Sequence, residues 1–184
     1  MRQLAEKAGI SEAMIYHHFP SKEALYDAML KDKLESSKHL FYPVEAANAG
    51  KDRAVLDTII GNFLREGRRD TSYMRMMLYS ALEGHEFATK AVNGPLQEFF
   101  RFLGSYLEKR MGNGTLKAVG GEVAARLVIG MAYHATLLRE IYHDPGIQNV
   151  DTEDLKNIIV DLFFHGISGS EARDVPVNAE RVGV

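Results

Sequence analysis

The sequence of 184 residues contains no cysteine. Without thiols the chain cannot form disulfides, thiolate zinc sites, iron-sulfur clusters or cysteine nucleophiles, and the absence fits a reducing cytoplasm. No uncharged run approaches the ~20 residues that a membrane span requires. The first twenty residues carry charges and no apolar stretch, so none of them is predicted to act as a signal peptide. We therefore expect a cytoplasmic protein without a membrane partner.

Excess positive charge is also lacking. The formal net charge is -3 and the isoelectric point is near 6.2, which argues against a protein that coats nucleic acid over its whole surface. A small DNA-reading module on a larger neutral body stays compatible with this balance. Apolar residues make up 46% and charged residues 26% of the chain, as in an ordinary globular protein of one domain, or of a small one fused to a medium one.

Alternating β-branched runs that would mark strands are missing, whereas apolar residues recur at helical spacing almost everywhere. The sequence therefore predicts an all-α protein. The expected helices span residues 2–8, 11–18, 21–38, 56–67, 71–82, 86–110 with a break at Asn93-Gly94-Pro95, 122–142 and 152–167. The segment 41–50 is the most loop-like internal stretch and the expected module boundary. Residues 170–184 are expected to be a mobile tail.

The first two predicted helices are short and closely spaced. Gly9 suits the positive φ of a helix C-terminus, Ser11 offers an N-cap for the second helix, and Ser21 offers one for the third. Leu4, Ala5 and Ala8 are expected to face inward. Two short helices joined by such a turn describe a helix-turn-helix, whose second helix can lie in the DNA major groove.

The same stretch supplies the side chains that DNA reading needs. A groove-reading helix needs small residues near its start so that its backbone can approach the bases, and donors that reach phosphates. The candidate DNA-binding residues are Ser11, Glu12 and Ala13 for the first role and Tyr16, His17 and Lys22 for the second.

Residues 3–25 read QLAEKAGISEAMIYHHFPSKEAL. In residue types, spacing and continuity this run resembles the DNA-binding signature of the TetR family of bacterial one-component repressors. The resemblance implies a recognition helix at residues 11–18, a DNA-binding domain at residues 1–40 and a regulatory, dimerising domain at residues 41–169. It also implies operator DNA, a small-molecule effector and a second copy of the chain as partners.

The resemblance further implies a helix ahead of the helix-turn-helix, which the family carries and which would end where this sequence starts. Residues 1–40 hold six Lys and Arg against six Asp and Glu, which is a low balance for a DNA-binding module. We therefore expect a truncated form or a start assigned too far downstream. The alternative function is that of a DNA-incompetent dimeric ligand binder or a heterodimer partner.

Methionine and aromatic residues gather in the middle helices. Taken singly, each of these residues more commonly packs in a core. As a set, together with a few polar side-chain ends, they favour an adaptable, mostly apolar pocket. The resemblance adds that family members bind inducers among these helices. The candidate ligand-binding residues are Phe63, Met74, Met77, Phe99, Phe102, Tyr106, Tyr133 and His134.

The last two predicted helices carry more apolar faces than one chain's core covers. Packed against their symmetry mates they would form a four-helix bundle between two protomers. The expected interface residues are Ala124, Val128, Ala132, Ala135, Ile159 and Phe163.

Enzyme motifs are absent. His17 and His18 are adjacent on a helix and point apart, and His85-Glu86 lacks the second histidine of a zinc-protease motif, because residue 89 is a threonine. We expect no metal, no cofactor and no catalytic residues. The sequence predicts a ligand-responsive transcriptional repressor that binds a near-palindromic operator as a dimer and is released by a small, mostly apolar effector.

Overall fold

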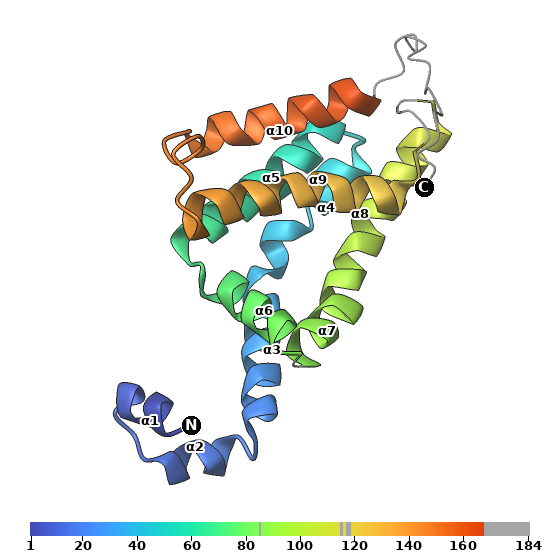
Figure 1. Cartoon of the computed structure of the whole chain (residues 1–184). Helices are drawn as coiled ribbons and strands as arrows, with labels where there is room; N and C mark the ends of the chain where they lie inside the picture. Colours follow the sequence, from blue (N-terminus) through green and yellow to red (C-terminus); the bar gives the residue numbers. More distant parts are fainter. Residues whose placement is uncertain (85, 115, 117–118, 168–184) are drawn as a thin grey trace, which may run out of the picture.

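The computed structural model describes residues 1–84, 86–114, 116 and 119–167, and these residues form helices and no strand (Figure 1). This confirms the all-α prediction. The helices are α1 (Arg2–Ala8), α2 (Glu12–His18), α3 (Lys22–Phe41), α4 (Val44–Asn48), α5 (Asp52–Arg69), α6 (Ser72–Leu82), α7 (Glu86–Asn93), α8 (Pro95–Gly112), α9 (Gly121–Thr136), a π-helical segment (Leu137–Ile141) and α10 (Thr152–Ile167).

Local signals set the ends of the first helices as expected. Gly9 ends α1 with a φ of 68°, which a residue without Cβ adopts freely. The Ser11 hydroxyl accepts a hydrogen bond from the Met14 amide at 3.1 Å, and the Ser21 hydroxyl accepts one from the Ala24 amide at 3.1 Å. Each serine therefore satisfies an amide that the first helical turn leaves without a partner.

Two stretches differ from the prediction. Helix α3 continues to Phe41, and α4 occupies much of the segment that was expected to be a loop. Tertiary packing accounts for both, because Phe41 meets the Phe99 ring edge-on at 6.2 Å and Ala46 and Ala47 pack against the main core. The helix predicted at residues 122–142 ends as an α-helix at Thr136 and continues as the π-helical segment.

We call residues 1–21 the head and the described residues of 44–167 the body; α3 joins the two, and the head hangs below the body (Figure 1). The body encloses a continuous core between α5, α8, α9 and α10. Helices α8 and α9 cross so closely that a Cβ at Gly121 would overlap the carbonyl oxygen of Gly104. A Cβ at Gly104 would in turn lie 2.8 Å from Cγ of Glu122, so both glycines permit the crossing.

The head has a much smaller core. Ala5 and Ile15 are buried, but Leu4 and Ala8 are exposed, so the prediction that they face inward was wrong. The two short helices contact each other, and Ala5 and Ile15 are the buried apolar residues of the head, while Phe19 is half-buried.

The expected interface residues lie inside the protomer. The side chains of Ala124, Val128, Ala132, Ala135, Ile159 and Phe163 are all buried within the single chain. Within the single chain this face of α9 and α10 packs on α5 and α8, and the contact of these residues with a partner stays a prediction. The apolar side chains that the same helices leave exposed are Val123, Leu127, Ile158 and Leu162.

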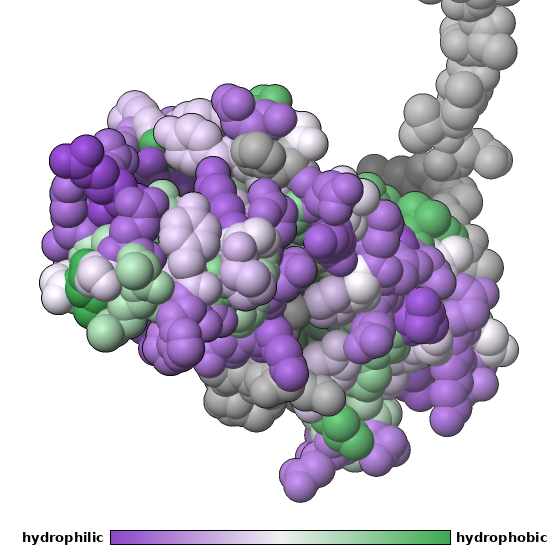
Figure 2. All heavy atoms as spheres, turned by 90° about the horizontal axis from the view of Figure 1, so that it is seen from below, coloured by the Kyte–Doolittle hydropathy of each residue, from purple (hydrophilic) through white to green (hydrophobic). Residues whose placement is uncertain are grey.

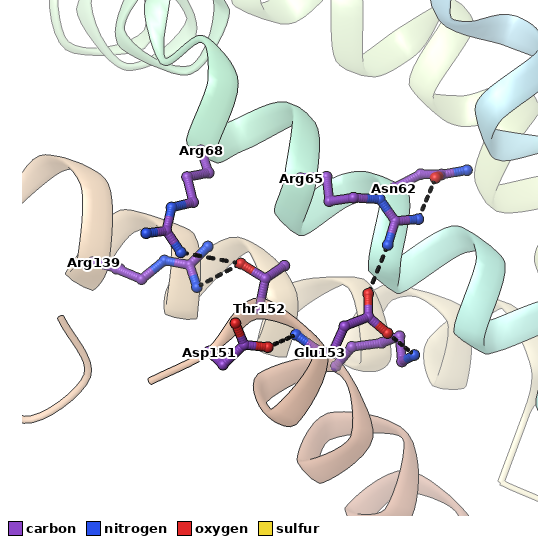
Figure 3. A network of polar contacts seen from close by, with 8 residues as sticks. Asn62, Arg65, Arg68, Arg139, Asp151, Thr152 and Glu153 are labelled. Atoms are coloured by element: carbon purple, nitrogen blue, oxygen red, sulfur yellow. Dashed lines mark hydrogen bonds and ion pairs between the residues drawn. The ribbon is translucent and has the colours of Figure 1, made fainter. Parts of the chain in front are cut away.

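A polar network joins α5, the π-helical segment and the start of α10; its labelled members are Asn62, Arg65, Arg68, Arg139, Asp151, Thr152 and Glu153 (Figure 3). Arg139 is only 1% exposed and forms an ion pair with Glu140 at 2.7 Å. Arg139 and Arg68 both donate to the Thr152 hydroxyl at 3.4 Å. A buried charge with these partners fixes the register of α10 on the body.

Within the part of the chain that the structure describes, no helix has the length and apolar character to cross a membrane.

Candidate functional site

The six candidate DNA-binding residues lie in the head and at the start of α3. All of them, Ser11, Glu12, Ala13, Tyr16, His17 and Lys22, are exposed. Seen from below, the surface of the molecule is mostly hydrophilic, with small hydrophobic patches (Figure 2). None of these six side chains belongs to the core of the head, so all six are accessible to a partner molecule.

The electrostatics of the head are balanced rather than strongly basic. Arg2 pairs with Glu6 at 3.2 Å, and the Lys22 ammonium lies 5.4 Å from the centroid of the Tyr26 ring. The rings of His17 and His18 meet edge-on at 5.3 Å. Since nonspecific affinity for DNA rises with each neutralised phosphate, a head with few free basic groups depends on a few well-placed contacts.

A cavity of about 560 Å³ opens between α3, α5, α6, α8 and α9. Its walls are mostly aromatic; the rings come from Phe41, Tyr42, Phe63, Tyr73, Phe99 and Phe100. Phe99 meets Tyr42 edge-on at 6.0 Å and Phe100 at 5.5 Å, so the rings support one another. This volume and this lining are typical of a small-molecule site.

Three of the eight candidate ligand-binding residues line this cavity, namely Phe63, Met74 and Phe99. The other five do not line it. Phe102 packs behind Tyr42, with ring centroids 5.0 Å apart, and Met77 packs against the small cluster around Phe87.

The remaining three have other surroundings. The Tyr106 hydroxyl donates to Asp52, whose carboxylate also pairs with Arg110 at 2.8 Å. This bond and burial raise the pKa of Tyr106 above its usual range. His134 is exposed, and Tyr133 is half-buried near Tyr142. Ligand contact by Met77, Phe102, Tyr106, Tyr133 and His134 stays a prediction, and these side chains do not line the cavity described here.

Sequence reasoning missed several residues of the wall. Tyr42 was assigned to a linker, although the aromatic pair Phe41-Tyr42 was a visible signal. Tyr73 precedes Met74 and was passed over because it lies off the predicted apolar stripe. Its hydroxyl is buried with no hydrogen-bond partner among the described residues, and burial raises the pKa of Tyr73 to about 12.

Charged residues also border the cavity, and no pattern in the sequence pointed to them. The carboxylates belong to Asp27, Glu66, Asp70 and Glu98, and the ammonium groups to Lys31 and Lys33. Glu98, together with burial, raises the pKa of the Tyr42 hydroxyl. Among the residues that the structure describes, no three histidine, aspartate or glutamate side chains gather to hold a metal ion.

Two short helices joined by a turn at Gly9, the second capped by Ser11, have the arrangement of a helix-turn-helix, a motif that DNA-binding regulators use. Comparison with known proteins agrees: residues 1–29 match the model of the family described as bacterial regulatory proteins, tetR family. The head and the first turns of α3 are therefore similar to the DNA-binding part of this family.

Curated relatives extend the similarity beyond the head. The nucleoid occlusion factors SlmA of Citrobacter koseri, Enterobacter sp. and Salmonella newport are each 28% identical to the chain over 120 residues. The match covers 61% of this chain and 57% of each relative. The chain therefore matches a little over half the length of these relatives.

Proposed function

We propose that the protein is a transcriptional repressor that binds a near-palindromic operator as a homodimer and is released when a small, mostly apolar effector enters the cavity. One observation supports this proposal above the others. The helix α3 begins at Lys22, beside the recognition helix, and the same helix supplies Asp27, Lys31, Lys33 and Phe41 to the cavity lining. A change in the cavity therefore acts on the helix that carries the head.

The homodimer part of the proposal rests on an exposed apolar face. Val123 and Leu127 on α9 are spaced four residues apart, as are Ile158 and Leu162 on α10, and each pair lies on one side of its helix. Their side chains are 51% to 64% exposed. A second copy of the chain that packs on the same face would remove this surface from water and pair the two heads.

The repression mechanism follows from this pairing. In the dimer two recognition helices enter successive major grooves about 34 Å apart. An effector that fits the cavity better in one arrangement of α3 than in another changes the share of dimers with operator-competent spacing. The proposed effector contacts include Phe63, Met74 and Phe99.

The DNA contacts are tested on a sequence selected from a random library with the purified protein. Lys22→Ala is expected to weaken binding to all sequences alike and to lower the salt slope by about one unit, since one phosphate contact is lost. Ala13→Val is expected to change the preferred bases instead. Lys51→Ala removes an equally exposed charge from the body and serves as the control. Equal loss of affinity in the Lys22 and Lys51 variants would contradict the assigned contact.

The dimer is tested by sedimentation. Leu127→Glu with Leu162→Glu is expected to give a monomer, because two charges then face each other across the proposed interface. Val92→Glu places the same charge at an exposed valine of α7 and is expected to leave the dimer intact. A wild-type monomer at micromolar concentration would refute this part.

A further inference from the structure

The charges that border the cavity are unequal. Among the described lining residues there are four carboxylates and two ammonium groups. The Glu66 carboxylate pairs with Lys33 at 3.5 Å and with Arg69 at 2.6 Å, so these charges compensate each other. Within the described part of the chain Glu98 forms no ion pair. A ligand inside the cavity meets aromatic faces and a surplus of carboxylate. Both interact favourably with a cation, and the carboxylates disfavour an anion.

One of these carboxylates has a second role. Asp27 borders the cavity and also pairs with Lys90 of α7 at 3.5 Å, while its neighbour Tyr26 packs on Phe87 with ring centroids 5.5 Å apart. These contacts hold the part of α3 nearest the head against α7. Lys90 does not line the cavity. Asp27 is therefore placed where a charge in the cavity and the Lys90 ammonium compete for one carboxylate.

We propose that the effector is a hydrophobic organic cation, whose aromatic or apolar part occupies the ring-lined cavity and whose positive charge competes with Lys90 for Asp27. Occupation then weakens the contact between α3 and α7. This inference rests on the proposed function, since it names the ligand class of the same cavity and the contact through which the ligand acts. A ligand can shift an equilibrium only through different affinity for its two states, and this competition supplies that difference.

The ligand class is tested with two probes of nearly equal size and shape and opposite charge, tetraphenylphosphonium and tetraphenylborate, and with neutral triphenylphosphine oxide. Calorimetry on the full chain is expected to show at least about tenfold tighter binding of the phosphonium than of the borate, which corresponds to one cation that meets a net negative wall. Equal binding of all three would overturn the charge assignment and leave the apolar effector site standing. No binding of any of them would overturn the effector site itself.

Two substitutions test the competition in opposite directions. Asp27→Asn is expected to weaken phosphonium binding about threefold, and Lys90→Ala to strengthen it about threefold, because an exposed ion pair contributes of this order. Asp32→Asn on the same helix and Lys109→Ala on α8 change the net charge equally at exposed positions that do not line the cavity, and both are expected to leave the affinity unchanged. Since general disruption does not strengthen binding, a weaker phosphonium complex in Lys90→Ala would refute the competition. If Asp27→Asn does not fold, Glu98→Gln tests the carboxylate surplus in its place.

Discussion

The head and the body use the same secondary structure with very different amounts of burial. In the head Ala5 and Ile15 are the buried apolar residues, whereas in the body α5 alone buries Val55, Leu56, Ile59, Ile60 and Leu64 almost completely. Since stability follows the apolar area removed from water, the body is expected to be stable on its own. The head is expected to open locally long before the body unfolds. In the proposed function, DNA binding falls to the less stable region and effector binding to the more stable one.

The largest effect is expected at the crossing of α8 and α9. Gly121→Ala places a methyl group against the backbone of Gly104, which cannot move aside, and is expected to destabilise the body by about 3 kcal/mol. Thermal or urea denaturation followed by circular dichroism measures this loss. Gly112→Ala is the matched control, because a Cβ there meets nothing within 4 Å, and it is expected to cost no stability.

A substitution in the head should separate the two regions. Ile15→Ala is expected to destabilise the head by about 2 kcal/mol through the loss of one of its few buried side chains. Hydrogen exchange should then accelerate in α1 and α2 while the thermal midpoint of the body stays constant. Met14→Ala, at the exposed neighbouring position, is the control. A fall of the body's midpoint in Ile15→Ala would show that the head and body unfold as one unit.

A smaller effect is expected from the helix caps. Ser11→Ala and Ser21→Ala should each cost about 1 kcal/mol of local stability, because the amides of Met14 and Ala24 lose their acceptors. The change should be visible in exchange of the first turns of α2 and α3. Ser105→Ala on α8 removes an exposed hydroxyl that caps no helix and is expected to be neutral. Equal exchange in all three variants would contradict the capping role.

The smallest effect concerns alkaline pH. Because the pKa of Tyr73 is raised to about 12 in the folded protein, its contribution is fully present below pH 10 and is lost as the pH rises from 10 to 12. The free energy of unfolding of Tyr73→Phe is therefore expected to fall less steeply with pH in this range than that of the wild type. Urea titrations of both proteins at pH 9, 10 and 11 measure the difference. Identical slopes would show that the hydroxyl ionises as freely in the folded state as in the unfolded one.

The sequence predicted what local chemistry determines. The caps at Ser11 and Ser21 and the turn at Gly9 depend on residues within three positions, so their roles were visible without a fold. The helix-turn-helix follows from these signals, and the resemblance to the tetR family rests on the same residues.

The cavity and the dimer face depend on distant contacts. Tyr106 turns to Asp52, 54 residues earlier, and no periodicity reveals such a bond. Helix α9 is apolar on two sides, and the sequence alone does not tell which side faces its own chain. The prediction therefore chose Ala124 and Val128 for the interface, whereas Val123 and Leu127 are the exposed pair.

The length of α3 has a geometric consequence for DNA binding. Its 20 residues span about 30 Å at 1.5 Å per residue. The cavity borders α3 from Asp27 to its last turn at Phe41, and the first turn of α3 at Lys22 joins the head. A tilt of about 10° at the cavity end therefore moves the other end by about 5 Å, nearly half the ~12 Å width of a major groove. Under the proposed function α3 would be a lever arm, through which a side-chain adjustment around a small molecule displaces the head by more than the ~3.4 Å rise of one base pair.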